Sequence, residues 1–212
     1  MRFTFVVVLS LCCFPVFSQT DWQKQKEEDG IQVFTKKVEG SKYKAFRGVG
    51  EIDTPLSAII AVFMDINSFT EWSHAAVEAR TVKLMAANEC VNYILTDAPW
   101  PVSDREGVYH FKIEQNKEDK SVMVSIKAVE GYVSEHPKRI RVPFSEGYWK
   151  LIPLGKDKTK VIYENHAEPG GTIPAWLANS SVINLPFKTI KKLQKHAKKP
   201  KYQKQKFSFI EE

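Results

Sequence analysis

The chain has 212 residues, of which 43% are hydrophobic, and 31 basic against 25 acidic residues give a net charge of +6. Three cysteines are too few for a disulfide framework, so stability must come from an apolar core, and this length suits one domain of ordinary size. The modest basic excess suits an acidic surface such as anionic lipid.

Residues 1–18 have the pattern of a secretory signal peptide. Arg2 supplies the positive start, residues 3–14 form an apolar run, and small residues precede an expected cleavage between Ser18 and Gln19. The run is shorter than the roughly 20 apolar residues that a membrane-spanning helix needs. We therefore expect an exported protein, periplasmic or extracellular if bacterial, whose mature chain keeps only Cys90.

The first half of the domain predicts strands around one helix. In the charged segment 21–29 we expect a short helix whose Trp22 packs on the body, and alternation over 31–35 and 43–52 predicts a hairpin. Thr54 as N-cap and Pro55 as first residue indicate a helix that extends to Ile66. Six further strands are expected over 77–85, 89–96, 107–115, 121–129, 139–153 and 159–167.

The last long element is an amphipathic helix. Gly170 and Gly171 end the preceding strand, Thr172 can cap the helix, and Pro174 suits its first turn. Apolar residues then recur at helical spacing and predict one buried stripe: Trp176, Ile183, Phe187, Ile190, Leu193 and Ala197.

These elements predict an α+β architecture with an internal space. About eight antiparallel strands curl, and a single long helix does not fill their concave face, so we expect a ligand tunnel or cup. Pro186 should kink the helix and let it move as a lid, and the basic segment 200–212 is expected to be a flexible tail.

Patterns for other chemistry are missing. None of the five histidines stands at metal-ligand spacing, and no glycine-rich nucleotide loop occurs, so no metal, cofactor or nucleic-acid partner is predicted. Cys90 is interpreted as a small buried hydrophobe. His166 ends the last strand and is a site candidate, although a histidine hydrogen-bonded at the surface is the favoured interpretation.

The segment 97–106 is a further candidate. Two prolines around Trp100 fix an extended loop between two strands, with little conformational entropy left to lose.

Two motifs together resemble the START (StAR-related lipid transfer) domain family. Pro-Trp-Pro-Val-Ser-Asp-Arg-Glu at 99–106 is similar to that family's Ω loop, and Pro-Gly-Gly-Thr-Ile-Pro-Ala-Trp at 169–176 to the entry into its C-terminal lid helix. Residues 146–149 and 161–164 resemble its last two strands, and the order of elements agrees over about residues 20–199.

The resemblance implies a helix-grip fold that binds one hydrophobic ligand, with the Ω loop and the last helix as its gate, and binding or transfer between membranes rather than catalysis. Glu106 stands where an aspartate is usual, and Phe111 where sterol-binding members carry an arginine. The candidate ligand-cavity residues are Arg80, Tyr93, Trp100, Arg105, Arg141, Tyr163, His166, Trp176, Ile183, Phe187 and Ile190.

Alternatives remain open from the sequence. An enzyme on the same scaffold, of the polyketide cyclase or hydrolase kind, would need an acid–base pair such as Arg105 or His166 with Glu164 or Asp104. A chaperone-like binder of apolar segments is a third interpretation. The lysines of 188–206 have two interpretations: transient contact with an anionic membrane, or a helix face that is simply solvated. The protein is expected to be a monomer. Asn179 begins a glycosylation sequon, which matters only in a eukaryotic host.

Overall fold

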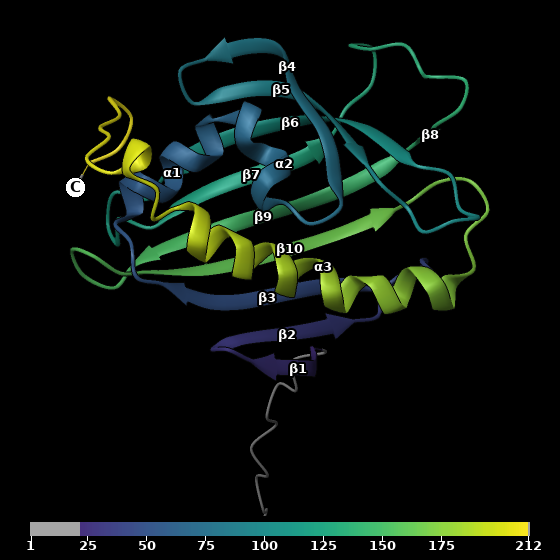
Figure 1. Cartoon of the computed structure of the whole chain (residues 1–212), viewed down its shortest axis with the longest axis horizontal. Helices are drawn as coiled ribbons and strands as arrows, with labels where there is room; N and C mark the ends of the chain where they lie inside the picture. The colour runs from purple at the N-terminus through teal and green to yellow at the C-terminus, as the bar shows by residue number, and fades with distance from the viewer. Residues whose placement is uncertain (1–21, 212) are drawn as a thin grey trace, which may run out of the picture.

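The computed structural model describes residues 22–211, so the expected signal peptide lies outside the described part of the chain. A ten-stranded sheet curves around the long C-terminal helix α3, which lies across its concave face (Figure 1). The order along the sheet is β1-β2-β3-β10-β9-β7-β6-β5-β4, and every pairing on this path is antiparallel. This confirms the α+β helix-grip architecture.

The strands are β1 (Gln23–Glu28), β2 (Ile31–Lys36), β3 (Ala45–Ile52), β4 (Ala76–Ala86), β5 (Glu89–Thr96), β6 (Arg105–Gln115), β7 (Val122–Ala128), β8 (Ile140–Arg141), β9 (Phe144–Pro153) and β10 (Thr159–Glu168). The helices are α1 (Leu56–Met64), α2 (Phe69–Trp72) and α3 (Ala175–His196), with 3₁₀ turns η1 (Ile66–Ser68) and η2 (Pro200–Tyr202).

Two strand assignments differ from the sequence prediction. The segment 23–28 is the edge strand β1, not a helix, because pairing with β2 satisfies its backbone while its mostly exposed polar side chains suit a sheet edge. The segment 139–153 divides into β8, which runs parallel to β6, and β9. Pro143 separates the two because it has no N–H to donate to a ladder.

Both predicted helix caps are wrong. The Thr54 hydroxyl donates to the carbonyl of Asp53 and leaves α1 uncapped, and Pro55 rather than Thr54 holds the N-cap position. Helix α3 likewise starts from Pro174 without a side-chain cap, so Thr172 has no such role. In each case the extended backbone of the proline leads into the first turn, and its carbonyl accepts the first helical hydrogen bonds.

Helix α3 is buried over its second half only. Phe187, Ile190 and Leu193 are at most 5% exposed, and Gly48 on β3 makes room for them, since a Cβ there would lie 2.8 Å from Ile190 Cδ1. By contrast, no residue between Ala175 and Leu185 is buried, and Trp176 is 73% exposed. The buried stripe predicted from Trp176 onward therefore starts only near Pro186.

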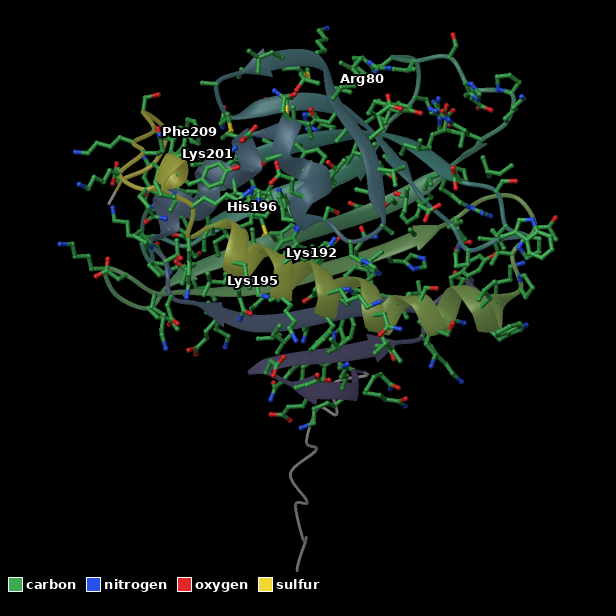
Figure 2. The ribbon with its side chains drawn as sticks, in the orientation of Figure 1. Arg80, Lys192, Lys195, His196, Lys201 and Phe209 are labelled. Carbon is green, nitrogen blue, oxygen red and sulfur yellow. The ribbon has the colours of Figure 1, made fainter. Side chains whose placement is uncertain are left out.

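The segment 200–211 packs against the domain, contrary to the flexible tail that the sequence predicted. Tyr202 is 3% exposed, and Phe207, Phe209 and Ile210 pack against the core (Figure 2). The backbone N–H of Glu211 donates to the side chain of Gln115, 2.7 Å away. Apolar residues interspersed among the lysines explain why this basic segment stays on the protein.

Among residues 22–211, no helix is long and apolar enough to cross a membrane.

Candidate functional site

The sheet register decides which side chains face α3. Gly48 and Gly50 of β3 face the helix, and they pair with Tyr163 and Val161 of β10. Because side chains alternate between the two faces of a strand, the residues opposite one another along successive strands form one concave wall. That wall includes Tyr163 and Asn165 on β10, Trp149 on β9, Ile126 on β7 and Tyr109 on β6.

Part of the concave wall is not fully buried. Tyr109, Ile126, Tyr163 and Asn165 are only partly buried although they face the inside of the fold. Burial from water raises the pKa of Tyr109 to about 12 and also raises that of Tyr163, so both phenols stay neutral. This wall thus combines apolar surface with a few neutral polar groups.

Two aromatic contacts and one hydrogen bond fix this wall. The Tyr163 ring stacks on Trp149 with centroids 4.1 Å apart, and Phe46 meets its edge at 4.8 Å. The Ser145 hydroxyl donates to Asn165 Oδ1 over 3.1 Å. Of the residues predicted for the site, Tyr163 lies here; Tyr109, Asn165 and Ser145 were missed, and their shared strand parity with Tyr163 was the only signal available.

Hydrogen bonds hold the start of α3. The guanidinium of Arg105, which is 8% exposed, donates to the carbonyls of Ser103, Pro169 and Gly170. Burial lowers the pKa of Arg105, yet a guanidinium remains charged at neutral pH. Gly170 has a φ of +69°, a conformation that suits glycine, where the chain turns from β10 toward the helix.

The loop before β3 supplies a second set of contacts to α3. Asn179 accepts a hydrogen bond from the Lys44 N–H (2.8 Å) and donates to the Lys42 carbonyl (3.2 Å), and the Tyr43 hydroxyl donates to the Ile173 carbonyl at 3.4 Å. The amide of the predicted sequon is thus engaged within the protein. Polar contacts, rather than buried apolar side chains, position the first half of the helix.

Two tryptophans, one of them on α3, and three lysines of α3 are exposed. Trp100, in the loop between β5 and β6, is 93% exposed, and Trp176 is on the solvent side of α3. Lys188, Lys192 and Lys195 follow on the helix and make no ion pair within residues 22–211 (Figure 2). The neighbouring lysines differ in this respect: Lys191, Lys199 and Lys201 pair with Asp29, Glu71 and Asp65.

A nearby histidine responds to these lysine charges. Burial and the positive charges of Lys188 and Lys192 lower the pKa of His74, whose backbone N–H donates to the Thr189 hydroxyl at 3.1 Å. The outer surface of α3 is therefore electropositive near its second half.

Arg80, Tyr93 and Arg141, three of the predicted cavity residues, lie on the convex face of the sheet instead. There the Tyr93 hydroxyl donates to Glu106 at 2.8 Å, and Arg141 pairs with the same carboxylate, which is 1% exposed. The Arg80 guanidinium lies 4.8 Å from the centre of the Tyr93 ring (Figure 2). These side chains hold the connection 129–141 onto the sheet and do not face α3.

His166 is also on the convex face. Its ring lies 5.8 Å from that of Phe144, and its Nε2 is 3.6 Å from a carboxylate oxygen of Glu168. Glu164, on the same face, pairs with Arg47 at 2.5 Å. Of the acid–base groups that the enzyme interpretation named, His166 and Glu164 therefore do not face the interior.

The residues 22–211 contain no group of three or more histidine, cysteine or acidic side chains arranged to hold a metal ion.

A curved antiparallel sheet that surrounds a long C-terminal helix defines the class of helix-grip proteins. The chain belongs to the START domain family, whose pattern it matches over residues 17–203. It is 41% identical to an uncharacterized protein of Pseudomonas aeruginosa over 84% of this chain and 88% of the relative.

Solved structures and a further relative agree with this assignment. A STAR-related lipid transfer protein from Xanthomonas axonopodis is 36% identical, with a TM-score of 0.79 over 85% of this chain and all of that one. Human STARD10, at 19% identity, matches with a TM-score of 0.77 over 88% of this chain and 77% of that chain, which supports the fold. The human phosphatidylcholine transfer protein is 28% identical over 80% of each chain.

We predict that Arg105→Gln loosens the first half of α3, because glutamine cannot reach the three carbonyls that the guanidinium holds. Amide hydrogen exchange should become faster over residues 170–185 and stay unchanged over 187–196. Arg80→Gln, which removes an arginine from the convex face, is the control. Equal protection of 170–185 in both variants would contradict this role for Arg105.

We predict that the ionised carboxylate of Glu106 stabilises the fold and that this stabilisation is lost in acid. Burial alone would raise its pKa, but hydrogen bonds from the His136 N–H, Arg141 and Tyr93, with the charge of Arg141, lower it below the ordinary 4.5. Because the folded pKa is depressed, the stabilisation is complete above the ordinary pKa and is lost as the pH falls through the folded pKa.

The measurement is the free energy of unfolding of the wild type and of Glu106→Gln at pH 7 and in acid. The wild type should be more stable at pH 7, and the difference should shrink below pH 4.5. A constant difference at all pH values would show that the carboxylate charge is not responsible.

Proposed function

We propose that this protein binds one lipid molecule between the concave wall of the sheet and the first half of α3, and transfers it between membranes. The observation that carries the proposal is the contrast within α3, whose second half packs on the core while its first half has no fully buried side chain. In this proposal the ligand lies against the partly buried wall of Tyr109, Ile126, Tyr163 and Asn165. Membership of the START domain family and the lipid transfer proteins among its relatives support the same function.

The chemistry of the wall suits a lipid. Each methylene transferred from water to an apolar surface contributes about 0.8 kcal/mol, so hydrocarbon chains supply the affinity. The neutral hydroxyls of Tyr109 and Tyr163 and the amide of Asn165 offer hydrogen bonds to ester or head-group atoms without the cost of burying an unpaired charge.

The first half of α3 acts as the gate in this proposal. Opening it would break the hydrogen bonds of Arg105, Tyr43 and Asn179, and a typical protein hydrogen bond contributes only about 1 kcal/mol net because water replaces it. Pro186 separates the two halves by removing one helical hydrogen bond. The packed second half, around Ile190, can then stay in place while the first half moves.

The outer surface of α3 provides the contact with the membrane. Trp100 and Trp176 present large amphipathic side chains of the type that partition into the membrane interface. Lys188, Lys192 and Lys195 add positive charge that can reach anionic head groups, at about 1 kcal/mol each. The gate would therefore open toward the bilayer.

We predict that Ile183→Glu reduces lipid retention, because Ile183 packs toward the interior from the gate half of α3. Native mass spectrometry of the purified protein should show much less co-purified lipid than in the wild type. Asn184→Glu, one residue along on the exposed side, is the matched control. Phe187 and Ile190 are unsuitable for this test, since a charge there would disrupt the core rather than the gate alone.

A wild-type protein that never carries lipid after expression or incubation with vesicles would contradict the proposed function. Equal lipid content in the two variants would instead show that the first half of α3 does not contact the ligand.

We predict that Lys188→Gln, Lys192→Gln and Lys195→Gln together weaken binding to anionic vesicles. Each charge removed should lower the affinity about fivefold at low salt, and the effect should shrink as salt is added. The control removes the same net charge from the convex face, at Lys112, Lys127 and Lys150. Vesicle co-sedimentation separates the two triple variants; equal losses would point to net charge alone.

A further inference from the structure

A separate cavity of about 60 Å³ lies between α1 and strands β4 to β7. Its apolar lining includes Phe63 and Met64 on the α1 side and Phe111, Ile113 and Val124 on the sheet. Cavities with an apolar lining take up apolar groups rather than water. This space therefore suits a piece of hydrocarbon.

The polar side chains at the cavity form hydrogen bonds with other groups of the protein. The Thr81 hydroxyl donates to Asn92 Oδ1 at 3.0 Å, the Asn88 amide donates to the Ile113 carbonyl at 2.8 Å, and Glu89 lies 2.7 Å from His110 Nε2. These groups have partners within the protein, so a polar ligand would gain little from them. The remaining lining surface is mainly apolar.

The cavity continues the concave wall on which the proposed lipid lies. Phe111 and Ile113 follow Tyr109 at two-residue steps on β6, and Val124 precedes Ile126 by two residues on β7, so all of them share one face. Two residues of a strand span about 7 Å. A hydrocarbon chain that runs along β6 from Tyr109 would reach the cavity within that distance.

The C-terminal segment 200–211 bonds to the protein on two sides of the cavity, beside α1 and on β6. Lys201 and Tyr202 bond to Asp65, which separates the lining residues Met64 and Ile66. At the other side Glu211 bonds to Gln115, two residues beyond Ile113 on the same face of β6. The segment lies beside α1 at the end of the sheet (Figure 1). It thereby fixes the α1 wall of the cavity relative to β6.

We infer that the cavity between α1 and β4–β7 receives the terminal methylenes of the bound lipid's hydrocarbon chain and so limits the chain length that the protein carries. This inference rests on the proposed function and adds to it the feature that determines how long the lipid's hydrocarbon chain can be. Cys90, which lines the cavity and is half-buried, gives direct access to it.

The test compares Cys90→Phe, which fills the cavity, with Cys90→Ser, which leaves it open at the same position. Each full-length protein is incubated with vesicles that contain equal amounts of saturated phosphatidylcholines of increasing acyl length, and the bound species are identified by native mass spectrometry. The Phe variant should shift to shorter chains, and each methylene excluded should lower the retention of the longest species about fourfold. The Ser variant should keep the wild-type distribution.

The outcomes separate this inference from the proposed function. If wild type and both variants bind the same distribution of chain lengths, the cavity is not the site of the chain end, while lipid binding itself stands. If none of the three binds phosphatidylcholine and none carries co-purified lipid, both proposals fail.

If Cys90→Phe does not fold, the test instead measures how fast N-ethylmaleimide alkylates Cys90. The chain used carries Cys12→Ser and Cys13→Ser, so that Cys90 is its remaining thiol. Burial raises the pKa of the Cys90 thiol, so the reaction is run at alkaline pH. Long-chain phosphatidylcholine should slow the reaction more than short-chain phosphatidylcholine. Equal rates with both would overturn the inference.

Discussion

The structure depends on the contact between the second half of α3 and strand β3. Ile190 fits over Gly48 and Gly50, which carry no side chain, so helix and sheet approach closely there. This grip buries Leu193 and Phe187 and fixes one end of the helix on the core. Because that end is secured independently, the first half of α3 can rest mainly on hydrogen bonds without destabilising the fold. The division of one helix into a packed part and a polar-contact part is what makes a gate physically reasonable.

Much of the fold could be predicted from alternation and turn residues, and the exceptions have physical causes. Strand β1 was missed because all six of its side chains are polar, as an edge strand allows, and only pairing with β2 makes it a strand. The packing of segment 200–211 was missed because lysines dominate its composition, although Tyr202 is buried and Phe209 packs against the core.

The site was harder to predict than the fold because strand β5 is apolar on both faces. Cys90 and Ile94 are on the concave face, while Val91, Tyr93 and Leu95 are buried under the connection 129–141. Alternation shows which residues share a face, but it does not show which face is inside when both are covered. Arg80, Tyr93 and Arg141 were therefore assigned to the interior, whereas Tyr109 and Asn165 were passed over. Arg105, predicted as a cavity residue, lies beside the glycine turn before α3, where it donates to the carbonyls of Pro169 and Gly170.

The pairing of β3 with β10 has a consequence for how the chain is made. Arg47 lies opposite Glu164, so the centre of the sheet joins segments separated by more than half of the sequence. Contacts of such sequence separation form slowly, since a long loop must close before they provide any stabilisation. The grip of α3 on Gly48 comes later still. A growing chain therefore cannot complete its sheet before β10, which ends at Glu168, has been synthesised, and until then the apolar faces of its earlier strands stay open to contact with other molecules.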